Sequence, residues 1–143
     1  MPIDPDSLPT LRDELDLLAD LVPLAEQRII ELGCGNARLA RGLVQRYAGA
    51  QLVGLEVDEV QHAKNVTNPQ QRLVFMAGSA EAVPFPDASF DGALMLKSLH
   101  HVPLHDMARA LDEVARVLKP GGWLYVSEPV YDGALNTLIK LFN

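Results

Sequence analysis

Apolar residues change their spacing in a regular way along the chain, from short continuous runs to a period of three or four residues. The short runs are rich in branched residues and predict strands at 28–32, 51–56, 72–77, 90–96 and 123–128. Helical spacing separates them and predicts helices from Leu39 to about Gly49, from Asp58 to about Asn68 and from Met107 to Leu118. Strands and helices therefore alternate.

Helical patterns also occur at the two ends of the chain, outside this alternating region. Before the first strand, Leu11, Leu15, Leu18 and Val22 share one helix face, which Ser7 or Thr10 can cap and Pro23 ends. After the last strand, apolar residues at 135, 138, 139 and 142 begin another helix. We divide the chain into an N-terminal helical segment (1–27), a core (28–128) and the start of a C-terminal helix (129–143), which we expect to be truncated.

The connections between strands are too long for hairpins and have the length of crossovers. Right-handed crossovers place consecutive strands parallel to one another, so the predicted fold class is α/β with a doubly wound parallel sheet. In such sheets ligands bind outside the carboxyl ends of the strands, where the strand order reverses. We expect the functional residues there.

Composition narrows the classes of partner. The chain has 143 residues, of which 48% are hydrophobic and 22% charged, as in an ordinary globular domain. Its net charge of -7 and the lack of a cluster of Lys and Arg argue against a nucleic-acid or anionic-membrane partner. The single cysteine, Cys34, excludes an internal disulfide, and the first residues do not resemble a signal peptide. We expect a cytoplasmic protein.

A glycine loop and two acids are the candidate ligand-binding residues. Gly33 and Gly35 follow the first strand, where small residues allow the backbone to approach a ligand closely. Glu56 ends the second strand, where a carboxylate can accept hydrogen bonds from ribose hydroxyls. Arg38 stands where a dinucleotide site would have a third glycine, and Glu31 would repel a diphosphate. A nucleoside with a cationic tail and no phosphate, such as S-adenosylmethionine, suits these features.

Four segments, in this order, resemble the class I S-adenosylmethionine-dependent methyltransferases, in particular the small-molecule branch called type 11. They are Ile29–Asn36, Val53–Glu56, Gly78–Asp91 and Glu113–Gly122, and the resemblance covers roughly residues 28 to 128. It implies a Rossmann-like sheet of five strands in the order 3-2-1-4-5, without the two further strands, one of them antiparallel, that family members generally add. The fifth strand would then be an exposed edge, through which we expect possible self-association.

The resemblance also implies roles for individual residues. Glu31 falls near the amino group of the cofactor, the loop around Gly35 beneath its methionine portion, and Glu56 at the ribose. Ser79 stands where the family usually has an Asp that accepts from adenine, so adenine recognition is expected to depend more on the backbone of Ala80. The expected cofactor-binding residues are Glu31, Gly33, Cys34, Gly35, Asn36, Glu56, Val57, Ser79, Ala80, Glu81 and Lys97.

Other polar residues have a plainer interpretation. Cys34 has no neighbouring His in the sequence and is interpreted as a packed loop residue rather than a nucleophile. Glu113 and Arg116 are interpreted as a pair on a helix surface with little energetic value. His100 and His101 follow the fourth strand, where they could serve as a base or form a wall of the pocket. The remaining histidines, His62 and His105, are predicted on exposed helix surfaces, and we assign no catalytic residue and no metal ligand.

Three functional hypotheses remain, in decreasing order of preference. The first is a methyltransferase that acts on an unidentified small molecule. The second is a cofactor-binding or interaction module, in effect a truncated methyltransferase core, that does not transfer methyl groups. The third, a dinucleotide-dependent oxidoreductase, is opposed by Arg38.

Overall fold

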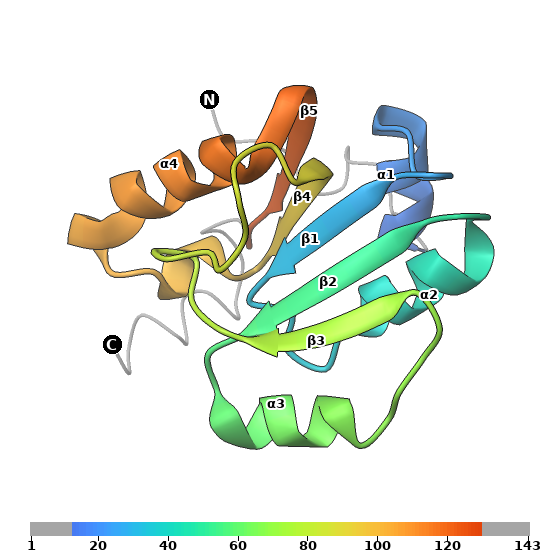
Figure 1. The fold of residues 1–143 in the computed structure, drawn as a ribbon, viewed down its shortest axis with the longest axis horizontal. Helices are drawn as coiled ribbons and strands as arrows, with labels where there is room; N and C mark the ends of the chain where they lie inside the picture. The colour runs from blue at the N-terminus through green and yellow to red at the C-terminus, as the bar shows by residue number, and fades with distance from the viewer. Residues whose placement is uncertain (1–12, 130–143) are drawn as a thin grey trace, which may run out of the picture.

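A computed structural model of the protein describes residues 13–129, in which strands and helices alternate as the apolar pattern predicts (Figure 1). The strands are β1 (Arg28–Leu32), β2 (Gln51–Glu56), β3 (Leu73–Ala77), β4 (Phe90–Leu96) and β5 (Leu118–Ser127). The helices are α1 (Glu14–Leu21), α2 (Arg38–Arg46), α3 (Glu59–Val66) and α4 (Met107–Val117), with the short 3-10 turns η2 (Leu99–His101) and η3 (Leu104–Asp106).

The five strands form one parallel sheet with the order β3-β2-β1-β4-β5. This order confirms the predicted Rossmann-like α/β class. The chain runs outward from β1 to β3 and then returns to the other side of β1, so the order reverses between β1 and β4. The loops after β1 and β4 diverge at this point, which leaves room for a ligand at the carboxyl end of the sheet.

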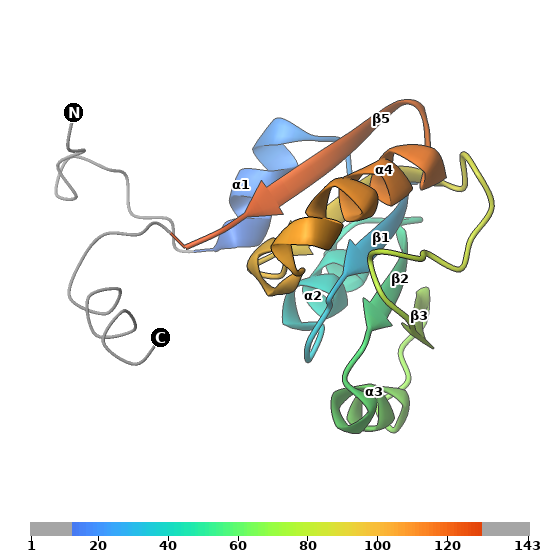
Figure 2. The same cartoon turned by 90° about the vertical axis from the view of Figure 1, so that its left-hand side faces the viewer.

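Apolar side chains cover both faces of the sheet because successive residues of a strand point to opposite sides. On β1, Ile29 packs with the apolar residues of α1 and α2, whereas Ile30 and Leu32 pack with those of α4. Figures 1 and 2 show α3 beside the outer strand β3. Glu31 shares the face of Ile29, so its carboxyl group points to the side covered by α1 and α2.

The predictions for the two terminal helices can be compared with the structure only in part. The N-cap of α1 is Asp13, whose carboxylate accepts from Leu15 N–H at 2.9 Å, while Ser7 and Thr10 lie outside the described residues. The helical pattern at 135–142 lies outside them as well. The boundaries at 27 and 128 therefore remain predictions.

Strand β5 begins at Leu118 and not at Trp123 as predicted. Phe90 pairs with Leu118 and Gly92 with Trp123, so residues 119–122 are an irregular insertion in the strand. Gly121 has a φ of +79°, which only glycine adopts without strain, and this permits the insertion. The glycine residues interrupt regular pairing without ending the strand.

Arg116 is not part of a simple surface pair, which corrects the prediction from the sequence. Its guanidinium contacts Glu113 at 2.8 Å and Asp87 at 3.0 Å, and it donates to the carbonyls of Val83 and Phe85 at 2.9 and 2.8 Å. The two carboxylates raise the pKa of Arg116 further above its ordinary value. Arg116 thus fastens the loop before β4 to helix α4.

The two histidines predicted on helix surfaces, His62 and His105, differ in their exposure to solvent. His105 on η3 is exposed as predicted, with 82% of its side chain accessible. His62 on α3 is half-buried, and its Nδ1 atom is buried without a hydrogen-bond partner among residues 13–129, so its prediction as a surface group was wrong. The sequence could not show this, because the contact depends on how α3 packs.

The outer edge of β5 has no neighbouring strand in the described part of the sheet. Leu124 and Val126 of this strand expose 38% and 40% of their surface. Self-association through this edge remains a prediction. In the described residues no helix is both long and apolar enough to span a membrane.

Two glycine substitutions should change stability in opposite directions. In Gly92→Ala the new methyl group would meet the indole ring of Trp123, so we expect a loss of about 1–3 kcal/mol in the free energy of unfolding. In Gly42→Ala, within α2, the methyl group would lie 3.6 Å from Leu15, an ordinary contact, and we expect a gain of about 0.5–1 kcal/mol. Urea unfolding measures both; equal effects would contradict the packing of Trp123 on β4.

Candidate functional site

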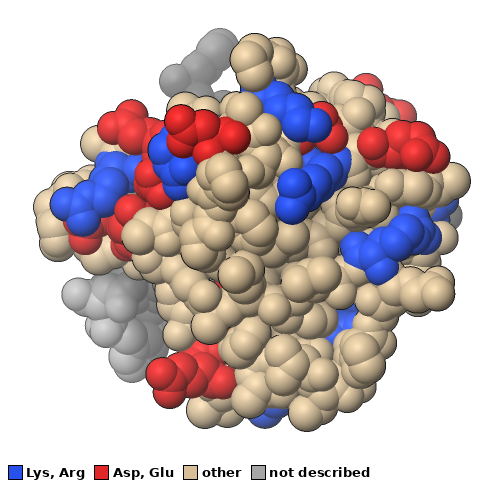
Figure 3. Space-filling view, in the orientation of Figure 1, with Lys and Arg blue, Asp and Glu red and all other residues tan. Residues whose placement is uncertain are grey.

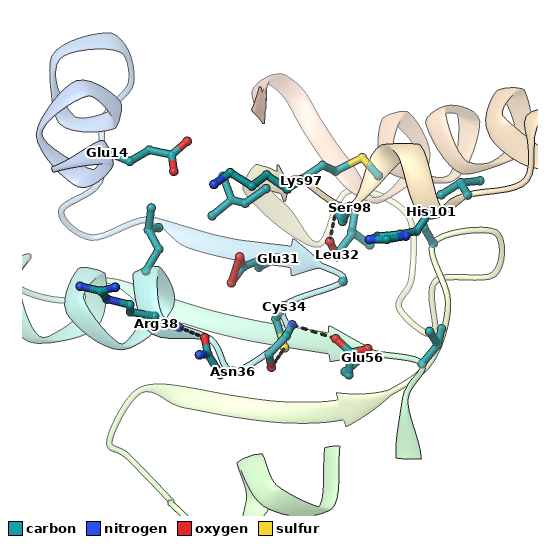
Figure 4. Close-up of a pocket in the computed structure, with 18 of the residues that line it drawn as sticks. Glu14, Glu31, Leu32, Cys34, Asn36, Arg38, Glu56, Lys97, Ser98 and His101 are labelled. Carbon is teal, nitrogen blue, oxygen red and sulfur yellow. Dashed lines mark hydrogen bonds between the residues drawn. The ribbon is translucent and has the colours of Figure 1, made fainter. Parts of the chain in front are cut away.

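A cavity of about 1070 Å³ opens at the carboxyl end of the sheet (Figure 4). Its walls come from α1, the loop after β1, the ends of β2 and β3, and the turn after β4. The lining residues are Asp13, Glu14, Leu15, Glu31, Leu32, Gly33, Cys34, Gly35, Asn36, Arg38, Leu39, Gly42, Glu56, Val57, Gly78, Ala80, Glu81, Met95, Leu96, Lys97, Ser98, His101 and Val102.

The glycine loop folds back onto β2 and leaves its outer side open. The N–H groups of Gly33 and Cys34 both donate to the carbonyl of Leu55 at 2.9 Å. A side chain at Gly33 would lie 2.8 Å from the Cβ of Ser98, whereas one at Gly35 would meet nothing within 4 Å. Gly33 therefore allows the loop to pack closely, and Gly35 leaves free space at the loop surface.

Ala37 adopts a backbone conformation that is unusual for its residue type. Its φ is +59°, in the left-handed region, and it lies directly before the first residue of α2. The side chain of Asn36 accepts from Arg38 N–H at 3.1 Å and stabilises the same turn. Ala37 thus adopts a conformation that glycine takes with less strain, directly before α2 begins at Arg38.

Two backbone N–H groups hold the carboxylate of Glu56. Gly35 N–H donates to Oε2 at 2.8 Å and Asp58 N–H donates to Oε1 at 3.1 Å. Each oxygen can accept a further hydrogen bond, because an ionised carboxylate offers about four acceptor positions. Glu56 is therefore oriented by the protein and can still accept from a ligand.

Glu31 is the most deeply buried acid of the cavity, with 2% of its surface exposed. Burial, together with the nearby carboxylates of Glu14 and Glu56, raises its pKa from the ordinary 4.5 to about 8. Its Oε1 atom has no hydrogen-bond partner among residues 13–129. A buried acceptor without a partner costs free energy, and a cationic donor in the cavity would remove that cost.

Cys34 is a poor nucleophile in this environment. Burial, followed by the charges of Glu31 and Glu56, raises the pKa of its thiol to about 12. The thiolate is the reactive form, so the thiol is inert near neutral pH. Asn65 of α3 donates to the carbonyl of Gly35 at 2.7 Å and lies 3.8 Å from the sulfur atom.

The cavity gathers ten of the eleven residues that the sequence predicts for cofactor binding. Ser79 does not line it, although its neighbours Gly78, Ala80 and Glu81 do. Lys97 lines it from the end of β4 with a φ of +54°, and its N–H donates to the carbonyl of Ser127 at 2.6 Å. The residue after β4 is thus held in a strained conformation at the rim of the cavity.

Helix α1 adds residues that the sequence analysis missed. Asp13, Glu14 and Leu15 line the cavity, and the carboxylate of Glu14 accepts from the hydroxyl of Tyr125 at 3.2 Å. In Figure 4, Glu14 and Lys97 point toward each other across the cavity. The amphipathic pattern predicts α1 itself but carries no signal for where the helix packs.

The charges of the lining favour a cation over an anion. Five acids, at 13, 14, 31, 56 and 81, face the cavity with two basic side chains, at 38 and 97. The excess of acids over basic side chains in the lining would repel a diphosphate and attract an ammonium or sulfonium group. No group of three potential metal ligands occurs in the part of the chain that the structure describes.

Comparisons with known proteins agree with this geometry. A family model described as a methyltransferase domain matches residues 30–126. The 27-O-demethylrifamycin SV methyltransferase of Amycolatopsis mediterranei is 35% identical over 118 residues, which cover 79% of this chain and 43% of that protein. The fatty-acid O-methyltransferase of Mycolicibacterium smegmatis is 36% identical over 110 residues, which cover 74% and 39%. This chain thus spans less than half the length of either relative.

Solved structures show the same fold. An S-adenosylmethionine-dependent methyltransferase from Thermotoga maritima has a TM-score of 0.70 and 31% identity, over 90% of this chain and 56% of that chain. The [4+2]-cyclase SpnF has a TM-score of 0.73 and 31% identity, over 85% and 46%. One neighbour is therefore named for a reaction other than methyl transfer.

Replacing Glu31 by Gln should stabilise the protein and weaken ligand binding. In the folded protein this carboxyl titrates near 8 rather than near its ordinary pKa of 4.5, so the folded state binds more protons between these values. Its contribution to stability is full below about pH 4.5 and decreases as the pH rises to about 8. Glu31→Gln should remove this loss of stability with rising pH. At pH 8 it should raise the free energy of unfolding by roughly 1–3 kcal/mol.

Urea unfolding at pH 5 and pH 8 measures this effect, with Glu81→Gln as the control. Glu81 is a second cavity acid, but it is only half-buried. If the free energy of unfolding of Glu31→Gln depends on pH as that of the wild type does, the carboxyl of Glu31 does not cause the dependence.

Proposed function

Since the chain belongs to the class I S-adenosylmethionine-dependent methyltransferases, we propose that it binds S-adenosylmethionine in this cavity and transfers its methyl group to an oxygen atom of a small molecule. The observation that carries the proposal is the pair of buried acids, Glu31 and Glu56, beside an open glycine loop. A cationic nucleoside without phosphate satisfies both acids.

The residues of the cavity fit the parts of this ligand. Glu56, held by two backbone N–H groups, would accept from the ribose hydroxyls. The buried Oε1 of Glu31, which has no partner among residues 13–129, would accept from the methionine ammonium group. The free space above Gly35 would receive the chain between them, and the backbone near Ala80 would border the adenine.

The reaction places few demands on the protein. When bound, S-adenosylmethionine supplies a methyl group on a positively charged sulfur, which is already activated toward displacement. The cavity residues hold the reactants in line and exclude water, and such positioning supplies much of the rate in reactions of this type. No side chain needs to take part in bond formation itself.

An oxygen acceptor is favoured by the names of the two relatives, both O-methyltransferases. A small-molecule acceptor, rather than a nucleic acid or a membrane lipid surface, is favoured by the charge pattern. On the face seen in Figure 3, Lys and Arg lie scattered among Asp and Glu and form no basic patch. We keep the cytoplasm as the proposed compartment, based on the single cysteine of the sequence.

A binding module without transfer activity remains the second candidate. It is favoured by the similarity of this fold to that of the [4+2]-cyclase SpnF. Formation of S-adenosylhomocysteine with any member of a panel of alcohols, phenols and carboxylic acids would exclude it.

Calorimetric titration with S-adenosylhomocysteine and with NAD tests the proposed ligand. We expect binding of the first and none of the second, because the acids oppose a diphosphate. Glu56→Ala should weaken binding by about 1–3 kcal/mol, the usual cost of losing a hydrogen bond to a charged group. Glu59→Ala, at the start of α3 and outside the cavity, is the matched control. Binding of NAD, or an unchanged affinity in Glu56→Ala, would contradict the proposal.

A further inference from the structure

Helix α3 turns a polar side chain toward the protein and two of its apolar side chains toward the solvent. Asn65 is 3% exposed, whereas Val60 and Val66 expose 66% and 49% of their surface. Burial of an amide group costs free energy unless its polar atoms are hydrogen-bonded, and an apolar residue at position 65 would avoid that cost. Residues that break the usual pattern in this way are often found at functional sites.

The amide group of Asn65 is hydrogen-bonded at both of its ends. Its Nδ2 donates to the carbonyl of Gly35 at 2.7 Å, and its Oδ1 accepts from Nε2 of Gln61 at 2.9 Å. Since a carbonyl oxygen can only accept, the amino end of Asn65 has to face Gly35, and Gln61 then fixes the other end. Asn65 thus connects α3 to the glycine loop in one orientation.

These two contacts belong to a closed ring of hydrogen bonds. Glu56 accepts from Gly35 N–H at 2.8 Å and from Asp58 N–H at 3.1 Å. The side chain of Asp58, which caps α3, accepts from Gln61 N–H at 2.9 Å. In order, the ring passes through Glu56, Gly35, Asn65, Gln61 and Asp58 and returns to Glu56.

The ring fixes Gly35, which packing does not hold. A side chain at this position would meet nothing within 4 Å, and its φ of +54° lies in a region where glycine is free to move. Its N–H is held by Glu56 and its carbonyl by Asn65. Gly35 and Glu56 line the cavity, whereas Asn65 does not, so any effect of Asn65 on a ligand has to pass through these two residues.

We propose that Asn65, fixed by Gln61, is a positioning residue that holds Gly35 and Glu56 in the geometry in which they bind the nucleoside ligand. Without its contact the Gly35 peptide would turn more freely, and Glu56 would lose a fixed donor. Part of the free energy of binding would then be lost to ordering the loop. This inference rests on the proposed function and adds to it a residue that does not touch the ligand.

Calorimetric titration with S-adenosylhomocysteine tests the effect on the ligand. Asn65→Leu removes the hydrogen bonds at nearly constant size, and we expect binding to weaken by about three- to tenfold. Asn68→Leu makes the same change at an exposed residue outside the cavity and should leave the affinity unchanged. In a protein that already carries Glu56→Ala, Asn65→Leu should weaken binding by less than about twofold, because Asn65 acts through Glu56.

Hydrogen exchange of the free protein, followed by NMR, tests the ring without any ligand. Asn65→Leu should make the amide of Gly35 exchange about tenfold faster or more, while the amides of the buried strand β1 keep their rates. Gln61→Leu breaks the ring without touching Gly35 and should act in the same direction, so it carries the test even if Asn65→Leu does not fold.

The two measurements separate the failure of this inference from that of the proposed function. An unchanged exchange rate at Gly35, or the same loss of affinity with and without Glu56, would overturn the role of Asn65 alone. Wild-type protein that does not bind S-adenosylhomocysteine would overturn the proposed function.

Discussion

The burial of two carboxylates beside one glycine loop is the constraint on which the site depends. Among residues 13–129, the buried Oε1 of Glu31 has no hydrogen-bond partner, and the carboxylate of Glu56 is held by two backbone N–H groups. Folding alone leaves both acids incompletely satisfied, which costs stability and favours a cationic ligand. The sheet order, which separates the loops after β1 and β4, provides the space in which such a ligand can reach both acids.

Much of the fold could be predicted because buried parallel strands have a strong local signature. The boundaries of β1, β2 and β4 agree with the apolar runs, and the caps and turn residues delimit α3 and α4 closely. The cavity residues of the loop and of strand β2 could be found as well, since each lies at the end of a strand and the resemblance gives it a role. Local pattern is sufficient where function lies at the ends of regular elements.

What could not be predicted depends on contacts between distant segments. The fastening of the loop at 83–87 by Arg116, the position of Glu14 on the cavity wall and the partial burial of His62 all depend on packing that no local spacing encodes. The left-handed Ala37 and Lys97 belong to the same group, because neither residue type signals a positive φ. Ser79 is the converse case: the resemblance implies a role for its position, but its side chain does not reach the cavity.

The central claim is that Glu31 holds a proton in the free protein and gives it up when the ammonium group of the ligand binds beside it. Calorimetry of S-adenosylhomocysteine binding at pH 7, in two buffers with different ionisation enthalpies, measures the protons exchanged on binding. The claim predicts release of nearly one proton by the wild type and of none by Glu31→Gln. A binding heat that does not depend on the buffer, or the same release from both proteins, would contradict it.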